Sequence, residues 1–242
     1  MYVRDKEYFK QRAEREMQED LPVIEAPVPD LLAHTCRILA YEGHESGLAG
    51  QITARGDKPG TFWTLQLGYG FDEATPERMV LVDDDLNPLT GGRVNAGVRF
   101  HVWIYNQRPE VNAIVHTHPP WSSALALTGR SLTAAHMDSS MLYDNCAYLP
   151  DWPGLPVADD EGRLISQALG PKKTILLANH GMVALGASLP AALRLAAEVE
   201  TLASQYWHAA QIGTPHVLDH GELDKVRAKF ASYGQAKPKY RR

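Results

Sequence analysis

The 242-residue sequence has little cysteine and no long apolar run. Its two cysteines, Cys36 and Cys146, lie in unrelated contexts, which predicts buried thiols in a reducing compartment and excludes a disulfide framework. No stretch approaches the ~20 apolar residues that span a bilayer, and no apolar leader with a cleavage site opens the chain. We therefore expect a cytoplasmic protein with no membrane partner.

Long basic runs are also missing. The net charge is −5, and the short basic stretch from Lys237 to Arg242 is most simply a solvated end. Nucleic acid is therefore not expected as a partner. Hydrophobic residues make up 44% of the chain, which is ample for a core and argues against disorder.

Charge and proline divide the chain into three parts. Residues 1–27 are rich in charge, contain Pro22 and Pro27, and predict an exposed N-terminal arm. Residues 28–212 mix helical and strand patterns without a repeat or a linker, and residues 213–242 predict a tail with one last helix. Hairpin signals occur beside crossovers, which favours one α/β domain with a mixed or antiparallel sheet between helices.

Local patterns place most elements of this domain. Helices are expected at 31–42, 97–107, 121–127, 160–169, 189–210 and 222–232, and strands at 61–66, 79–82, 173–177 and 182–185. Residues 133–150 give no clear pattern. The run Asp83–Pro88 predicts a solvated turn, because it lacks the alternate oxygen spacing and the distal glutamate of a calcium loop.

Two histidines close an apolar stretch at Ala113–Pro120. If Ala113 to Val115 begin a strand, His116 and His118 project to the same face, because side chains alternate along a strand. The two prolines that follow cannot donate backbone hydrogen bonds and end the strand. Two imidazoles pointing the same way form half of a metal site.

A second apolar strand, residues 174–178, ends in Asn179-His180-Gly181. Two strands that each end in histidine can bring three imidazoles to one edge of a sheet. Neutral imidazoles suit Zn²⁺, Fe²⁺, Mn²⁺ or Co²⁺, and catalytic sites of this kind leave a position open for substrate or water. The sequence therefore predicts one divalent metal ion per subunit, although an isolated HxH motif arises often by chance.

Three segments together resemble the class II aldolase/adducin family: residues 108–119, Asn179-His180-Gly181 and the glycine-polar loop 50–55. The similarity covers roughly residues 28–212. It implies a three-layer α/β/α domain with a mainly antiparallel central sheet of the nine-stranded type. It also implies a C4 homotetramer with active sites at subunit interfaces, and a cation that acts as an electrophile during cleavage of a C–C bond. The metal ligands it implies are His116, His118 and His180.

The sequence departs from the sugar-phosphate aldolases of that family in two ways. Their glutamate before the metal strand falls on Gly97 here, a neighbourhood that resembles the adducin-like branch. Gln51 replaces the usual asparagine of the first loop, and Leu65–Gly70 replaces Ser/Thr-Gly phosphate-binding motifs. A non-phosphorylated, carboxylate-bearing substrate is therefore expected, which could reach the metal through two of its oxygens.

Further site residues are assigned as hypotheses beside ordinary structural roles. His101 shares a helical face with position 97 and could act at the metal or be a core histidine, and Tyr148 could supply a proton. Arg55 could bind a substrate carboxylate. Trp121 could line an aromatic pocket or pack in the core. Gln51 could bind substrate, as its place in the glycine-polar loop of the resemblance implies.

The preferred interpretation is a metal-dependent lyase that breaks a C–C bond of a non-phosphorylated acid. The reaction would be decarboxylation of a hydroxylated aromatic or heteroaromatic acid, or retro-aldol cleavage. One alternative is a non-haem Fe²⁺ oxygenase that uses the same three histidines. The other is an adducin-like interaction module without catalysis, which the retention of all three histidines disfavours.

Overall fold

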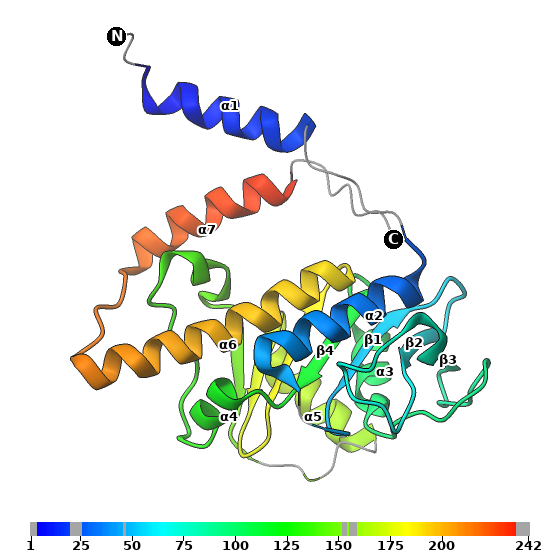
Figure 1. Ribbon diagram of the computed structural model, residues 1–242. Coiled ribbons are helices and arrows are strands. Elements are labelled where there is room, and N and C mark those ends of the chain that lie inside the picture. The colour runs from blue at the N-terminus through cyan, green and yellow to red at the C-terminus, as the bar shows by residue number, and fades with distance from the viewer. Residues whose placement is uncertain (1–3, 20–25, 46, 152–153, 155–158, 236–242) are drawn as a thin grey trace.

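The computed structural model of the protein describes residues 4–19, 26–45, 47–151, 154 and 159–235. Figure 1 shows a layered body with one long helix across it and two helices that extend from it. The helices are α1 (Lys6–Glu19), α2 (Val28–Leu39), α3 (Val98–Gln107), α4 (Pro120–Ala126), α5 (Asp159–Leu169), α6 (Leu189–Ile212) and α7 (His220–Gln235). The strands are β1 (Gln51–Arg55), β2 (Thr61–Leu65), β3 (Met79–Asp83), β4 (Ala113–Thr117), β5 (Cys146–Leu149), β6 (Thr174–Leu177) and β7 (Met182–Gly186).

The strands form one sheet in the order β3-β2-β1-β4-β7-β6-β5. Every neighbouring pair is antiparallel except β5 and β6, which run parallel at one edge. The first four strands of the chain lie together on one side of the sheet and the last three on the other. The two groups meet where β4 pairs with β7.

Helices cover both faces of this sheet. On one face α2, α4 and α6 pack over a core that includes Ile52, Val115 and Ala184, and on the other α3 and α5 pack over Phe62, Ile114 and Val183. Neighbours in each strand alternate between the two cores, as the two-residue period of a strand requires. The predicted three-layer α/β/α fold with a mainly antiparallel sheet is confirmed.

The central strands β4 and β7 are mostly apolar because both of their faces are covered. All five residues of β4 and of β7 are buried.

Helix α6 begins where the Ser188 side chain accepts a hydrogen bond from the N–H of Ala191. Pro190 is tolerated in the first turn because its missing N–H is not needed there.

Three details differ from the sequence-based expectation. The described residues form seven strands instead of nine. After β3 the chain returns with a single bridge between Val82 and Pro88, because proline has no N–H to extend the pairing. The second difference is strand β5, which lies in residues 133–150, where the sequence gave no clear pattern. The third is the end of helix α2. Its α-helical part ends at Leu39, and a π-helical turn, Ala40–His44, follows, in which Gly43 takes a left-handed conformation (φ 85°).

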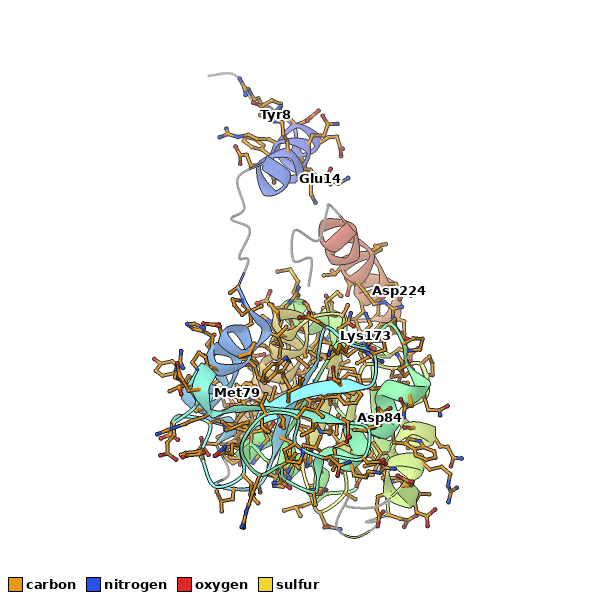
Figure 2. The ribbon with its side chains drawn as sticks, turned by 90° about the vertical axis from the view of Figure 1, so that its right-hand side faces the viewer. Tyr8, Glu14, Met79, Asp84, Lys173 and Asp224 are labelled. Carbon is orange, nitrogen blue, oxygen red and sulfur yellow. The ribbon has the colours of Figure 1, made fainter. Side chains whose placement is uncertain are left out.

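The first and last helices of the described residues, α1 and α7, lie outside the layers. In both views α1, which carries Tyr8 and Glu14, stands clear of the body, and α7 projects beside it (Figure 2). Part of the predicted arm (residues 1–3 and 20–25) and the basic stretch Lys237 to Arg242 are outside the described residues. No helix in the described ranges combines the length and the apolar character needed to cross a membrane.

Candidate metal centre

Strand β4 delivers the first two histidines. His116 lies within the strand and His118 just after it, so alternation directs both rings to the same side of the sheet. The strand ends because Pro119 and Pro120 cannot donate to a neighbour, and α4 begins at once. The Nδ1–H of His116 donates to the carbonyl oxygen of Met182 at 2.9 Å, which fixes the ring and leaves the lone pair of Nε2 available.

The third histidine lies in the tight turn between β6 and β7. Asn179 adopts a left-handed conformation (φ 55°), which asparagine tolerates better than most residues, and this directs His180 toward the end of β4. Gly181 packs against the end of β4, beside the first two histidines. A methyl group on its Cα would lie 2.4 Å from the carbonyl oxygen of Thr117 and 2.5 Å from Cδ2 of His118. Only glycine fits this approach without a shift of the surrounding atoms.

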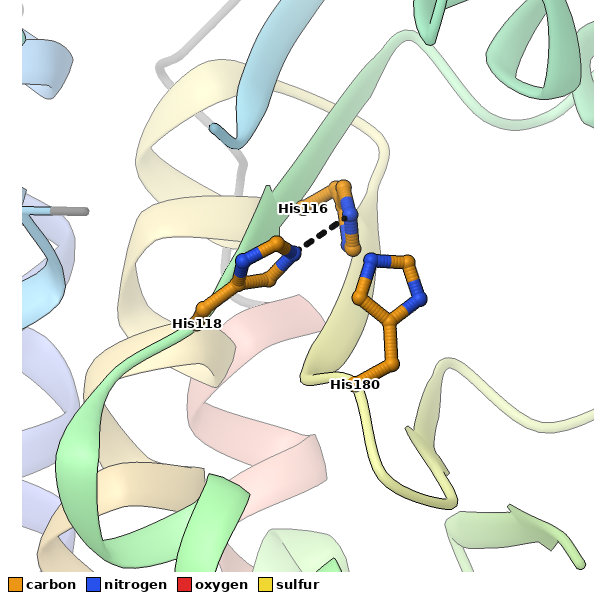
Figure 3. A group of neighbouring side chains, drawn as sticks. All are labelled: His116, His118 and His180. Atoms are coloured by element: carbon orange, nitrogen blue, oxygen red, sulfur yellow. Dashed lines mark hydrogen bonds between the residues drawn. The ribbon is translucent and has the colours of Figure 1, made fainter. Parts of the chain in front are cut away.

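The three rings converge on one point, as Figure 3 shows. The Nε2 atoms of His116 and His118 are 3.1 Å apart, and one nitrogen from each of the three residues lies within 4.8 Å of the others. Ring centroids are 4.5 to 4.8 Å apart. Two nitrogens bound at metal–nitrogen distances of 2.0–2.1 Å around a tetrahedral ion are about 3.3 Å apart. The geometry therefore fits one divalent cation held by His116, His118 and His180.

The histidines are also in the protonation state that binds metal. Burial lowers the pKa of all three; the neighbouring rings add to this for His116 and His180, and the pKa of His180 falls to about 3. Each ring is therefore neutral at pH 7, with one nitrogen lone pair to donate. His116 is 1% exposed, whereas His118 and His180 are half-buried, so the centre is open on their side.

No carboxylate or thiol joins this cluster in the part of the chain that the structure describes. Position 97, where the family resemblance places the glutamate of sugar-phosphate aldolases, is a glycine at the N-terminal end of α3. Three neutral ligands leave the full charge of the cation uncompensated by protein. An anionic ligand from solution would supply that compensation.

A small surface hollow, with a cavity volume of about 20 Å³, lies beside Gln51. Gln51 pairs directly with His116 across β1 and β4, so the two side chains point to the same face. The pocket is lined by residues without a charged side chain: Gly47, Leu48, Gly50, Gln51, Thr64, Leu65, Gln66, Leu67, Gly68, Tyr69, Phe71 and Asn95. It is thus an uncharged hollow of mixed polar and apolar character, and none of the three histidines is among its lining residues.

His101 lies in the core next to the metal ligands, in a series of hydrogen-bonded polar side chains. Its Nδ1 is 2.9 Å from Oγ1 of Thr53, which is 2.9 Å from the hydroxyl of Tyr105. The His101 ring lies 6.4 Å from that of His116, and Phe100 packs edge-on against both. Burial lowers the pKa of His101 to about 3, so it is neutral and faces no open space.

The structure does not bring Arg55 to the histidines. Its Nε donates to the carbonyl of Val111 at 2.7 Å, its Nη2 donates to that of Tyr105 at 2.7 Å, and the guanidinium lies 4.7 Å above the Tyr105 ring. Arg55 is four residues along β1 from Gln51, or about 13 Å at 3.3 Å per residue. It joins β1 to the C-terminal end of α3.

Tyr148 is also remote from the ligands of its own chain. Its hydroxyl donates to the carbonyl of Ala126 at 3.0 Å. The register of β5, β6, β7 and β4 places Tyr148 in line with Leu176, Met182 and Thr117, on the face opposite to the one that carries the metal ligand of β4. A role in proton transfer would require a contact that this register does not provide within one subunit.

Trp121 lies in the first turn of α4, and its side chain contacts α6. Its ring packs against Trp207 and His208, with centroids 5.1 Å away in both cases. Its backbone N–H donates to Oε1 of Glu200 at 2.7 Å, and that of Ser122 donates to Oε2 at 2.8 Å. Glu200 is buried and holds the start of α4, directly after His118 and the two prolines. The sequence analysis missed it; the available signal was a carboxylate inside an Ala/Leu-rich helix.

His44 is a second residue that the sequence analysis left without a role. It is fully buried, and its Nδ1 lies 2.8 Å from Oγ1 of Thr117, the residue between the two histidines of β4. Burial lowers the pKa of His44 to about 4. The contact ties the π-helical turn after α2 to the metal strand from the other face of the sheet, and nothing in the local sequence marks it.

The chain is similar to known proteins along most of its length. Residues 30–207 match the Class II Aldolase and Adducin N-terminal domain. The 5-methylthioribulose-1-phosphate/5-deoxyribulose-1-phosphate aldolase of Rhodospirillum rubrum is 36% identical over 204 residues, which cover 84% of this chain and 90% of that protein. The L-fuculose 1-phosphate aldolase of Glaciozyma antarctica PI12 has a solved structure that matches with a TM-score of 0.79 and 27% identity, covering 92% of each chain.

Two Streptomyces proteins are similar over a shorter stretch. Each is 36% identical over 152 residues, or 61% of this chain: the 4-hydroxy-3-prenylphenylpyruvate oxygenase/4-hydroxy-3-prenylbenzoate synthase of Streptomyces roseochromogenus, covered over 55% of its length, and the decarboxylase NovR of Streptomyces niveus, covered over 56%. Relatives of this chain therefore include proteins named as aldolases, as a decarboxylase and as an oxygenase.

Proposed function

Because this chain belongs to the class II aldolase and adducin family, we propose that it is a metal-dependent lyase that breaks a C–C bond. Its substrate is a small, non-phosphorylated carboxylic acid with a hydroxyl group close to the carboxylate. The observation that carries the proposal is the set of three converged, neutral histidines with no protein carboxylate beside them among the described residues.

His116, His118 and His180 would hold the ion, which is Zn²⁺, Mn²⁺, Fe²⁺ or Co²⁺. When bound, such an ion supplies Lewis-acid stabilisation of negative charge on a substrate oxygen. The chain's own contribution is to fix the rings: Met182 orients His116, and Gly181 seats the turn of His180 against His118.

The open side of the centre favours a substrate that offers two oxygens. His118 and His180 are half-buried, and no carboxylate of the described residues competes for the remaining positions. A carboxylate and a neighbouring hydroxyl can occupy two positions together. In decarboxylation the bond to the carboxyl carbon then breaks, CO₂ leaves, and the remaining carbon keeps the electron pair until it takes a proton from water.

The neutral pocket supports a non-phosphorylated substrate. Its lining contains no lysine or arginine, and its hydroxyl groups come only from Thr64 and Tyr69. Phosphate is usually bound through several charged or hydroxyl donors, and this lining offers few of them. Leu48 and Leu67 add exposed apolar surface at its edge. Decarboxylation of a hydroxylated aromatic acid is the reaction we prefer, and retro-aldol cleavage is the other C–C lyase reaction compatible with the centre.

The decisive experiment combines metal analysis with a substrate screen. The purified protein should contain about one divalent ion per chain, and its His118→Ala variant markedly less. Loaded protein is then incubated with hydroxylated aromatic and heteroaromatic acids, and CO₂ release is measured. CO₂ release by the wild type and not by His118→Ala supports the proposal. Aldehyde release from a hydroxy acid without CO₂ would support retro-aldol cleavage instead.

An oxygenase is the second candidate, because one Streptomyces relative carries that activity in its name. Three histidines also suit Fe²⁺ with positions left for other ligands. Oxygen consumption during turnover, with loss of activity under argon, would favour this reaction over decarboxylation. A protein that binds no metal, and whose His118→Ala variant behaves like the wild type, would favour a non-catalytic interaction module.

We also propose a cytoplasmic location and a homotetramer with its sites near subunit interfaces. The free, buried thiols of Cys36 and Cys146 fit a reducing compartment. Exposed apolar side chains such as Tyr41 and Ile212 provide surfaces that a second subunit would cover.

A further inference from the structure

Gln51 and Gly97 share one small space on the face of the sheet that carries His116. A methyl group on the Cα of Gly97 would lie 2.9 Å from both Nε2 and Oε1 of Gln51 and 3.0 Å from its Cδ. A Cβ atom essentially never lies this close to a nonbonded heavy atom, so a side chain at position 97 would require the carboxamide of Gln51 to move. The carboxamide of Gln51 therefore fills the volume in which any side chain at position 97 would begin.

The same carboxamide carries an open hydrogen-bonding position. Gln51 is directly opposite His116 in the pairing of β1 with β4, and cross-strand Cβ atoms of this kind lie about 5 Å apart. Its side chain is 8% exposed, and Oε1 has no hydrogen-bond partner within the described part of the chain. Buried amide oxygens are nearly always paired in folded proteins, and a ligand is one way to complete the pairing.

Few charged groups surround the Gln51 carboxamide. The ligand cluster contains three neutral imidazoles, and the pocket that Gln51 lines contains no charged side chain. A divalent ion at the centre would therefore keep two positive charges in a partly dry environment, where Coulomb interactions are stronger than in water. A glutamate beside it would remove one of these charges, whereas glutamine removes none.

We propose that Gln51 is a substrate-binding and selectivity residue: its carboxamide hydrogen-bonds to a ligand at the metal centre, and its neutrality makes the centre select dianionic, chelating ligands. This inference rests on the proposed function for its metal, and it deepens that function by naming the substrate class. Gly97 is part of the same device, because it is the residue that leaves room for the carboxamide.

A double-mutant cycle tests the packing without any metal or substrate. The backbone at Gly97 (φ −59°, ψ −18°) is helical and accepts alanine, so Gly97→Ala alone should be harmless unless Gln51 fills the space. We expect Gly97→Ala to lower the melting temperature by about 4 °C or more in the wild-type background. In the Gln51→Ala background the same change should have no effect or raise it. Equal effects in both backgrounds would overturn the shared-space argument.

A second experiment tests the charge, with oxalate as the dianionic probe. The Co²⁺-loaded protein is titrated with oxalate, and binding is followed by the visible absorption of Co²⁺. Gln51→Glu has nearly the same shape and adds one negative charge, so we expect oxalate to bind at least 10-fold more weakly and Co²⁺ itself about 10-fold more tightly. Gln205→Glu, an exposed change on α6, adds the same net charge and should alter neither affinity by more than about 2-fold.

These experiments distinguish a failure of the Gln51 proposal from a failure of the proposed lyase function. An unchanged oxalate affinity in Gln51→Glu, or an equal loss in Gln205→Glu, overturns the role of Gln51 whatever reaction the enzyme performs. If Gln51→Glu weakens oxalate as expected while no hydroxy acid is turned over, the selectivity of the centre stands and the assigned reaction falls.

Discussion

Asn179 and Gly181 shape the metal centre as much as the histidine between them. The left-handed backbone of Asn179 sets the direction of the turn, and the missing side chain of Gly181 lets this turn contact the end of β4. Ligand residues can be found from a sequence by their spacing. The residues that make their approach possible are recognised only when the neighbouring atoms are known.

Gly181→Ala is therefore expected to weaken metal binding by about 10- to 100-fold. The added methyl would meet the carbonyl of Thr117 and the ring of His118, so one ligand must move. Competition titration with a chromogenic chelator measures the affinity. Gly213→Ala, where the added methyl meets nothing within 4 Å, is the matched control and should bind metal like the wild type. Wild-type affinity in Gly181→Ala would refute the close-packing argument.

Arg55 separates a structural role from a substrate role. Because its guanidinium donates to carbonyls of Val111 and Tyr105, we expect Arg55→Ala to lower the free energy of unfolding by about 2 to 4 kcal/mol. Urea denaturation measures this, and KM should change little at temperatures where the variant is folded. A large rise in KM with unchanged stability would instead restore the hypothesis that Arg55 binds the substrate carboxylate.

At the scale of elements, sequence patterns predicted what depends on local periodicity. The apolar strand before His116, the helix at 98–107 and the long helix α6 were all expected within a few residues of their bounds. Two residues near the site were not predicted: Glu200 and His44 contact Trp121 and Thr117, which lie far away along the chain. Strand β5 was missed because its four residues become a strand only by parallel pairing with β6.

The link between the π-helical turn and β4 predicts a pH dependence of stability. Burial lowers the pKa of His44 to about 4, so below its ordinary pKa of 6.5 the unfolded chain binds a proton that the folded chain does not. The free energy of unfolding should then fall as pH drops from 6.5, by about 1.4 kcal/mol per pH unit from this residue, and the loss should level off near pH 4.

Urea denaturation of wild type and His44→Gln between pH 7 and pH 4 isolates this effect. Glutamine keeps a hydrogen-bonding group for Thr117 but does not titrate. The wild type should therefore lose about 3 kcal/mol more than the variant across the range. Parallel stability curves for the two proteins would show that His44 is not held neutral by the fold.

At the scale of the whole molecule, the exposed apolar side chains are the feature that one chain leaves unexplained. Tyr41 is 90% exposed and Ile212 is 89% exposed, and Trp207 and Ile38 are about half exposed. Where exposed apolar side chains form a contiguous patch, the patch marks a contact surface. The proposed homotetramer would bury some of them and bring a neighbouring subunit toward the open side of the centre.

Light scattering coupled to gel filtration tests this assembly. We expect a mass about four times the 26.8 kDa of one chain. Tyr41→Asp and Ile212→Asp each place a charge on an exposed apolar surface, and at least one of them should lower the mass while leaving the circular dichroism spectrum unchanged. A wild-type mass of one chain at micromolar concentration would contradict the assembly.

The order of the strands gives the metal a further part to play. Residues up to His118 build β1 to β4, residues from Cys146 onward build β5 to β7, and the ligands come from both sides of the β4–β7 junction. If the chain were cut after Ala126 and the two fragments were produced separately, each would carry an incomplete ligand set. Zn²⁺ should then promote their reassembly in wild-type fragments but not in fragments with His180→Ala. The ion would link the two parts of the protein, so tight metal binding would require that both halves of the sheet are paired.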